Sequence, residues 1–206
     1  MSWIVVRDTN PDDLLDILTE FIGTPIRVFR AHPMWKPITI DLDRPPGRSG
    51  GIGFNSLHQD FVNCQSPPDY ACFYCVRPDP NGGGQNIVAD LTGIEDEVSD
   101  PAPLYARVYA DGQSCNLDWV GPDISPFPIV SETGWRYRWT GRLLDSYPEL
   151  YEAAEVLAHR QRVIDLDAGD ALIVDQRRVV HGRLPLAGDQ RLLTERRELL
   201  SCYVRR

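Results

Sequence analysis

Short apolar runs, each bounded by turn residues, make up most of the chain. The runs are rich in Val, Ile, Tyr and Trp, which is typical of β-strands. Turn signals such as NGGG, ADG, ETG and AGD separate them, and many of the 17 prolines fall in the intervening loops. The predicted strands are 3–8, 25–30, 38–42, 70–76, 86–91, 106–110, 135–139, 162–166, 171–175 and 198–204.

Two stretches follow the helical period instead. In the first, Asn10 is a suitable N-cap, Pro11 fits the first turn, and Gly23 can end the helix. The second begins at about Ser146, where SYPE has the spacing of a capping box, and continues through Leu157. Many short strands with two helices predict a mainly β sandwich or jelly roll with the helices packed outside.

Length and charge narrow the class of protein. The 206 residues suit a single domain spanning 1–206 that builds its own core. A formal net charge of −9 disfavours nucleic acid and anionic membrane as partners, so a small molecule is the expected ligand. No apolar run is long enough to span a membrane and the N-terminus lacks a signal-peptide core, which predicts a cytoplasmic protein. The pattern does not predict an oligomeric state.

The five cysteines, without a secretion signal, favour reduced thiols over disulfides. Cys72 and Cys75 form a CxxC motif, the spacing of many zinc ligands. The motif lies within a predicted strand, however, where a spacing of three sends the two side chains to opposite faces. The chain has no second CxxC, so two core thiols are the better interpretation.

A histidine and a carboxylate two positions apart form the main candidate for chemistry. On a strand, His58 and Asp60 in LHQD would share a face, and together they are two-thirds of the facial triad that binds non-haem Fe(II). For the isolated pair, a structural ion pair is an equally good interpretation. The chain has three other histidines. His32 lies in a loop-like stretch and His159 at the end of a predicted helix, so His181, at a strand end beside a glycine, is the candidate third ligand.

Iron chemistry of this kind also needs a group that holds an organic acid against the metal. Arginine is suited to this task, because its planar guanidinium binds a carboxylate through two charge-assisted hydrogen bonds. Downstream of His181 the chain offers Arg191, Arg196 and Arg197. The last two directly precede the predicted strand 198–204, which places them at one end of the sheet.

Four segments in order, LHQD, PPDYACFYCVRPDPNGGGQNIVADL, GDALIVDQRRVVHGR and RRELLSCYV, resemble the taurine dioxygenase and clavaminate synthase-like family. This resemblance implies a double-stranded β-helix, a cupin-like jelly roll, that uses Fe(II), 2-oxoglutarate and O2. It implies that His58, Asp60 and His181 bind the iron. Arg197 matches the arginine that binds the distal carboxylate of 2-oxoglutarate, and Arg196 is the near alternative.

Two positions depart from the family pattern. Asn86 lies where the family commonly has a threonine that touches 2-oxoglutarate, and its amide can still donate a hydrogen bond. Taurine dioxygenase has a further arginine at the position of Ser201, so this chain lacks a second arginine there. The implied 2-oxoglutarate contacts are therefore Arg197 and Asn86, with Arg196 as the alternative to Arg197.

The resemblance implies hydroxylation of an unactivated C–H of a small molecule, an amino acid or a natural-product intermediate, with succinate and CO2 as co-products. Asp60 favours hydroxylation over chlorination, because related halogenases have a small residue in its place. Two other functions stay open: a non-catalytic sensor that binds metal or 2-oxoglutarate, and a cupin-like metalloenzyme that does not use 2-oxoglutarate. Asn55 and Gln59 flank the motif and are candidate substrate contacts, and Asp118 is a candidate partner for a cationic substrate.

Overall fold

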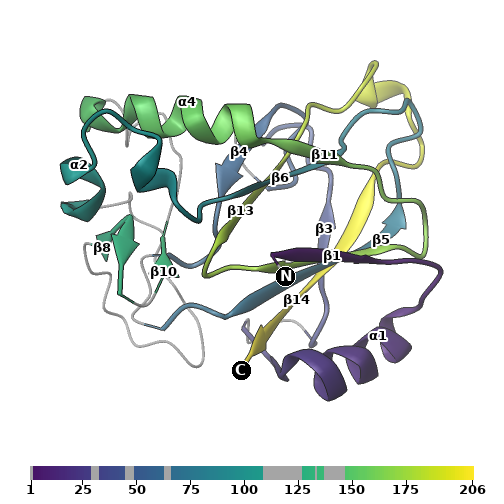
Figure 1. Cartoon of the computed structure of the whole chain (residues 1–206). Coiled ribbons are helices and arrows are strands. Elements are labelled where there is room, and N and C mark those ends of the chain that lie inside the picture. Colours follow the sequence, from purple (N-terminus) through teal and green to yellow (C-terminus); the bar gives the residue numbers. More distant parts are fainter. Residues whose placement is uncertain are drawn as a thin grey trace.

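The computed structural model describes residues 2–28, 33–44, 49–62, 66–108, 127–132, 134–136 and 147–206. Within these ranges the chain forms two main antiparallel sheets that pack face to face, with helices on their outer sides (Figure 1). None of the described helices combines the length and apolar character that a membrane span requires.

The larger sheet has six strands, in the order β1-β12-β5-β14-β2, with β3 also paired to β14. Its strands are β1 (Trp3–Val6), β2 (Thr24–Ile26), β3 (Lys36–Thr39), β5 (Tyr70–Arg77), β12 (Ala171–Asp175) and β14 (Glu198–Arg205). The smaller sheet has the order β11-β6-β13-β4. Its strands are β4 (Asn55–His58), β6 (Asn86–Asp90), β11 (Arg162–Ile164) and β13 (Val179–Arg183).

Two short ribbons complete the described β-structure. In one, β7 (Arg107–Val108) pairs with β8 (Phe127–Pro128), and in the other β9 (Val130–Ser131) pairs with β10 (Gly134–Trp135). Both fall short of the strands predicted over 106–110 and 135–139, because residues 109–126 and 137–146 lie outside the described part of the chain. The mainly β architecture agrees with the sequence-based prediction.

The main core lies between the two sheets. Alternate residues of β5, β12 and β14 meet alternate residues of β6 and β13 there, as in Phe73, Leu199, Val88 and Val179. Because strand side chains alternate between faces, the other residues of the same strands form separate cores under the helices. Cys75 belongs to the core between the sheets and Cys72 to an outer core, and both thiols are free, as the spacing in the CxxC motif predicted.

The first helix follows the prediction closely. It runs as α1 (Pro11–Ile17), continues as a π-helical turn (Leu18–Ile22) and ends at Gly23. The Asn10 side chain accepts hydrogen bonds from the backbone N–H groups of Asp12 and Asp13, each at 3.0 Å. Leu14 and Leu18 are fully buried against the outer face of the larger sheet.

The second helix begins close to its predicted start. A 3-10 turn (Pro148–Leu150) leads into α4 (Tyr151–Arg160), and neither has a side-chain N-cap. Ser146, the expected cap, lies outside the described residues. The 3-10 turns Ile94–Asp96 and Gln190–Leu192 and the short helix α2 (Ala102–Tyr105) were not predicted. Figure 1 shows α4 across the smaller sheet and α1 against the larger one.

Candidate metal centre

The pairing of β13 with β4 brings two histidines from distant parts of the chain together. His181 lies directly opposite His58 in this antiparallel pair, and their ring centroids are 4.7 Å apart. Side chains at directly opposed positions of such a pair lie on the same face. His181 is at the centre of β13, not at a strand end as expected, because β13 extends on to Arg183.

Asp60 completes a cluster with these histidines. It lies two residues beyond the end of β4, in a turn, and not on the strand itself as its spacing suggested. Its Oδ1 is 3.6 Å from His58 Nε2, and its Oδ2 is 3.5 Å from His181 Nε2. One potential ligand atom from each residue lies within 4.8 Å of the others, and no other such group of three occurs in the described residues.

Hydrogen bonds around the cluster fix the ligand atoms. His58 Nδ1 lies 2.7 Å from the backbone oxygen of Ser56, which only accepts, so Nδ1 carries a proton and Nε2 is the ring nitrogen that faces Asp60. The Asp60 N–H donates to Gln176 Oε1 at 2.8 Å, and the Tyr203 hydroxyl donates to Asp60 Oδ2 at 2.8 Å. The Phe73 ring lies against His181, with centroids 4.8 Å apart.

The electrostatics favour the metal-binding forms of Asp60 and His181. Burial raises the pKa of Asp60, but the hydrogen bonds to His181 and His58 outweigh it and hold the pKa well below its usual range. Burial also lowers the pKa of His181, which is only 6% exposed. An ionised carboxylate and neutral imidazoles are the forms that bind metal. Two imidazole nitrogens and one carboxylate oxygen on one side of a buried site fit a divalent ion of the facial-triad type.

Arg197 provides a buried cation between the same two sheets. It directly precedes β14 and is 5% exposed, and its Nη2 donates to Asn86 Oδ1 on β6 at 3.2 Å. Burial, and then the nearby Arg183, lower its pKa to about 10, so it remains charged near neutral pH. No carboxylate of the described residues forms a salt bridge with it. A buried guanidinium of this kind can bind an acidic ligand.

Arg196 lies differently, although it is the adjacent residue. Its Nε donates to the backbone oxygen of Gln190 at 2.7 Å, and its own backbone oxygen accepts from Arg77. Successive side chains near a strand point to opposite sides, so only one of the two arginines can face the inter-sheet core. The assignment of 2-oxoglutarate binding to Arg197 stays a prediction, and the geometry favours it over Arg196.

A glycine and a buried aspartate shape the space around Arg197. A Cβ on Gly84 would lie 2.9 Å from Arg197 Cδ and 2.6 Å from Leu186 Cδ2, so the backbone there must approach closely. Asp79 joins this loop to the loop before β14. Its carboxylate accepts from the backbone N–H groups of Asn81, Gly83 and Ala187 and from Gln190 Nε2, at 3.2, 3.2, 2.7 and 3.1 Å.

Replacing Asp79 with Asn is expected to lower the free energy of unfolding at pH 7 by about 1–3 kcal/mol, because an amide cannot accept all four bonds. Burial raises the pKa of Asp79, but the hydrogen bonds, led by that from Ala187, lower it below its ordinary 3.8. Its stabilisation is therefore complete above pH ~4 and is lost as the pH falls further. Urea unfolding of both proteins at pH 7 and pH 3 measures the effect.

Asp189→Asn is the control for Asp79, because Asp189 is exposed in the same loop and accepts one backbone bond. A difference between Asp79→Asn and the parent protein that is as large at pH 3 as at pH 7 would contradict a role for the ionised carboxylate.

The three candidate substrate contacts, Asn55, Gln59 and Asp118, differ in their positions in the structure. Asn55 is partly exposed at the start of β4, opposite Arg183. Gln59 is 1% exposed, and its Nε2 donates to the backbone oxygens of Trp135 and Gln176. This amide therefore supports the turn after β4 that carries Asp60 (the metal loop, residues 59–62). Asp118 lies outside the described residues, as does His32.

Two residues that form hydrogen bonds with Asp60, Tyr203 and Gln176, were not predicted from the sequence. Tyr203 shares the inner face of β14 with Leu199, so the alternation of RRELLSCYV contained a signal that it points inward. Gln176 carried no such signal, because it lies in the turn after β12 and reaches Asp60 only through the fold.

Comparison with known proteins supports the fold. No protein-family model matches the sequence, and no curated protein sequence matches it. An asparagine oxygenase in complex with Fe(II), (2S,3S)-3-hydroxyasparagine and succinate superposes with a TM-score of 0.70 at 18% identity, covering 98% of this chain and 74% of that chain. The non-haem iron oxygenase OrfP in complex with Fe and alpha-ketoglutaric acid gives a TM-score of 0.72 at 18% identity, covering 100% and 75%.

A further OrfP structure, with Fe, succinate and (3S)-hydroxy-L-Arg, gives a TM-score of 0.70 at 16% identity, covering 100% of this chain and 76% of that one. Nearly the whole chain therefore corresponds to about three quarters of each neighbour. The prediction of a jelly-roll double-stranded β-helix is confirmed, and the chain is similar in fold to non-haem iron oxygenases.

Proposed function

We propose that residues 1–206 form one Fe(II)- and 2-oxoglutarate-dependent oxygenase domain that hydroxylates an unactivated C–H of a small molecule. The observation that carries this proposal is the convergence of His58, Asp60 and His181 within 4.8 Å, between sheets that also enclose Arg197. The solved neighbours, which contain Fe with 2-oxoglutarate or succinate, support it.

Each residue of the site has a distinct role in this function. The two histidine Nε2 atoms and the Asp60 carboxylate would hold Fe(II), which with bound 2-oxoglutarate supplies oxygen activation and yields succinate and CO2. Arg197 would bind the distal carboxylate of 2-oxoglutarate, and Asn86 orients that guanidinium through its Oδ1. Because Asp60 keeps a carboxylate ligand, hydroxylation is favoured over chlorination.

A free amino acid is the first substrate class to test. The neighbours are in complex with 3-hydroxyasparagine and with (3S)-hydroxy-L-Arg, which supports this class. The net charge of −9 supports a small molecule in place of nucleic acid. The cytoplasmic location stays a prediction of the sequence.

The test is an oxygen-dependent assay with anaerobically purified protein, Fe(II), ascorbate and labelled 2-oxoglutarate, offered a panel of amino acids. Substrate-dependent succinate formation, together with a product 16 mass units heavier, is the expected result. Binding of Fe(II) and 2-oxoglutarate without turnover of any compound would favour the sensor instead. If adding 2-oxoglutarate to the Fe(II) protein produced no visible charge-transfer band, a metalloenzyme independent of this co-substrate would be favoured.

Replacing Tyr203 with Phe is expected to weaken Fe(II) affinity about 10-fold or more. The phenol hydroxyl bonds the carboxylate that would bind iron, and such outer partners typically contribute 10–100-fold to metal affinity. The Phe ring fills the same space, so the fold should be preserved. Anaerobic Fe(II) titration against a competing chelator measures the change.

Tyr74→Phe provides the matched control, because the Tyr74 hydroxyl bonds the backbone oxygen of Thr9 on the outer side of the larger sheet. Equal Fe(II) affinity in Tyr203→Phe and Tyr74→Phe would show that the Tyr203–Asp60 bond does not position the ligand.

A further inference from the structure

A cavity of about 340 Å³ opens where the larger sheet meets the metal loop. Its walls come from four separate segments: the residues before β5, the β9–β10 ribbon, the turn after β12 and the end of β14. The volume is at the lower end of the range for small-molecule sites. It can therefore accept a small molecule or one end of a larger one.

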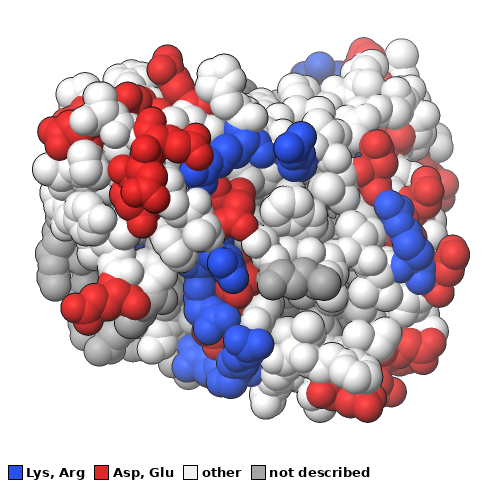
Figure 2. Space-filling model, viewed as in Figure 1, with Lys and Arg blue, Asp and Glu red and all other residues white. Residues whose placement is uncertain are grey.

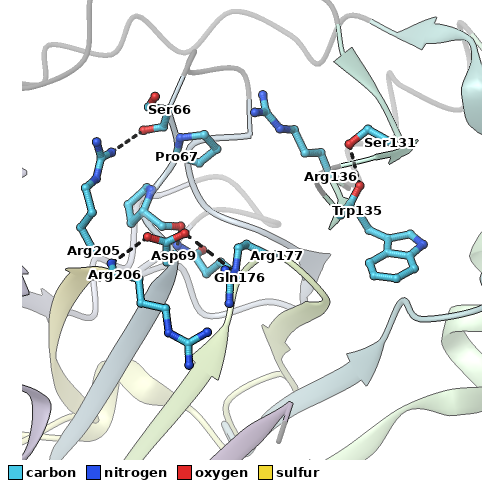
Figure 3. Close-up of a pocket in the computed structure, with 12 residues that line it drawn as sticks. Ser66, Pro67, Asp69, Ser131, Trp135, Arg136, Gln176, Arg177, Arg205 and Arg206 are labelled. Carbon is cyan, nitrogen blue, oxygen red and sulfur yellow. Dashed lines mark hydrogen bonds and ion pairs between the residues drawn. The ribbon is translucent and has the colours of Figure 1, made fainter. Parts of the chain in front are cut away.

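The charge of this cavity is opposite to that of the chain. Four arginines line it, Arg136, Arg177, Arg205 and Arg206, against the side-chain carboxylate of Asp69 and the main-chain carboxylate of Arg206. Figure 3 shows Arg205 directed at Ser66, Arg177 beside Asp69, and the side chains of Arg136 and Arg206 on opposite sides of this group. Figure 2 shows Lys and Arg side chains gathered on the face where β14 ends. In a chain with a net charge of −9, such a local excess of positive charge attracts an anion.

Contacts within the wall orient the arginines. Arg205 Nη2 donates to the backbone oxygen of Ser66 at 2.9 Å, and the Arg206 N–H donates to Asp69 Oδ2 at 2.8 Å. The guanidinium carbons of Arg177 and Arg206 lie 5.7 and 5.8 Å from the centroid of the Tyr70 ring.

The two arginines beside Tyr70 differ in their ion pairing. Arg177 is paired with Asp175, whereas no carboxylate of the described residues forms a salt bridge with Arg206. Of these two arginines, Arg206 is the more available to a ligand.

The cavity shares a wall with the metal centre. Gln176 lines the cavity, and its Oε1 accepts from the backbone N–H of Asp60. On the same side, Arg136 Nη1 donates to the backbone oxygen of Val62 at 3.4 Å. Both ends of the metal loop are thus bonded to residues that line the cavity.

We propose that this arginine-lined cavity binds the anionic group, a carboxylate or a phosphate, of an acidic small molecule. That this molecule is the substrate rests on the proposed function, whereas the anion site itself does not. Guanidinium groups bind both kinds of anion through paired hydrogen bonds. The cavity would hold the acidic end of the substrate next to the loop that carries Asp60.

The first experiment tests the site without iron or oxygen. Metal-free protein is titrated calorimetrically at constant ionic strength with inorganic phosphate and with citrate, which separates phosphate from carboxylate recognition. At least one probe is expected to bind saturably to the parent protein. The double variant Arg136→Gln/Arg206→Gln is expected to bind that probe at least about tenfold more weakly, because charge-assisted hydrogen bonds are lost.

Three variants complete the design. Arg162→Gln removes an exposed arginine of β11 outside the cavity and should leave affinity unchanged. Arg197→Gln removes the other buried guanidinium that could bind the probe, so binding that persists in this variant belongs to the cavity. The single variant Arg206→Gln changes a terminal exposed residue and serves if the double variant does not fold.

Failure of both probes to bind the parent protein would overturn the proposal. So would equal affinity in the parent protein and the Arg206→Gln variant, or a loss seen only in Arg197→Gln.

A second arm separates this proposal from the proposed function. In the oxygenase assay, the double variant should raise KM for acidic amino acids and leave KM for neutral ones unchanged. If no compound is turned over but the anion still binds, the oxygenase function fails and the anion site stands. If turnover is normal and KM for acidic compounds is unchanged in the variant, the cavity does not hold the substrate.

Discussion

His181→Ala is expected to abolish tight Fe(II) binding and, with it, oxygen-dependent succinate formation. The imidazole is one of three groups whose ligand atoms converge within 4.8 Å, and the remaining pair cannot form a facial triad. Changes to outer partners of a metal site already cost about 10–100-fold in affinity, so loss of a ligand should cost more than about 100-fold. Anaerobic Fe(II) titration and the turnover assay report the two effects separately.

His159→Ala is the matched control for His181. His159 is exposed in the last turn of α4, away from the cluster, and its removal should change neither Fe(II) affinity nor turnover. His181 also packs against Phe73 in the core, so the variant should lose some stability, and thermal unfolding has to show that it is folded at the assay temperature. A folded His181→Ala protein with parental Fe(II) affinity would remove His181 from the ligand set.

Local signals in the sequence predicted the parts of this molecule that local forces determine. Asn10 and Gly23 bound the first helix as expected, because capping depends on residues within one turn of the helix end. Cys72 and Cys75 lie in different cores, as predicted, because neighbouring side chains alternate between the two faces of a strand. The capping box predicted at SYPE stays a prediction, because Ser146 lies outside the described residues and the described helix begins with the 3-10 turn at Pro148.

The site itself was predictable only in part, because it is assembled from distant segments. The resemblance identified His58, Asp60 and His181, and the antiparallel register of β4 and β13 explains how 123 residues of separation (181 − 58) become a direct contact. Gln176 and the arginine-lined cavity had no sequence signal. Their residues come from four segments that meet only after both sheets have formed, so no spacing along the chain records their proximity.

Arg197→Gln is expected to raise the apparent KM for 2-oxoglutarate by about 10- to 100-fold. A buried guanidinium offers the distal carboxylate two charge-assisted hydrogen bonds, and a neutral amide can replace only one of them, so one bond of about 1.5–3 kcal/mol is lost. Fe(II) affinity should change little, because Arg197 contacts Asn86 and none of the three candidate ligands. Steady-state assays over a range of 2-oxoglutarate concentrations, with an anaerobic Fe(II) titration alongside, measure both quantities.

Arg196→Gln tests whether the adjacent arginine binds 2-oxoglutarate, and so decides between the two arginines. Arg196 donates to the backbone oxygen of Gln190, so its loss should disturb the loop before β14 without a large effect on KM. Arg197→Lys should fall between the parent protein and Arg197→Gln, because lysine keeps the charge but not the planar pair of donors. A larger rise of KM in Arg196→Gln than in Arg197→Gln would reverse the assignment. It would mean that the side chain facing outward here turns inward when 2-oxoglutarate binds.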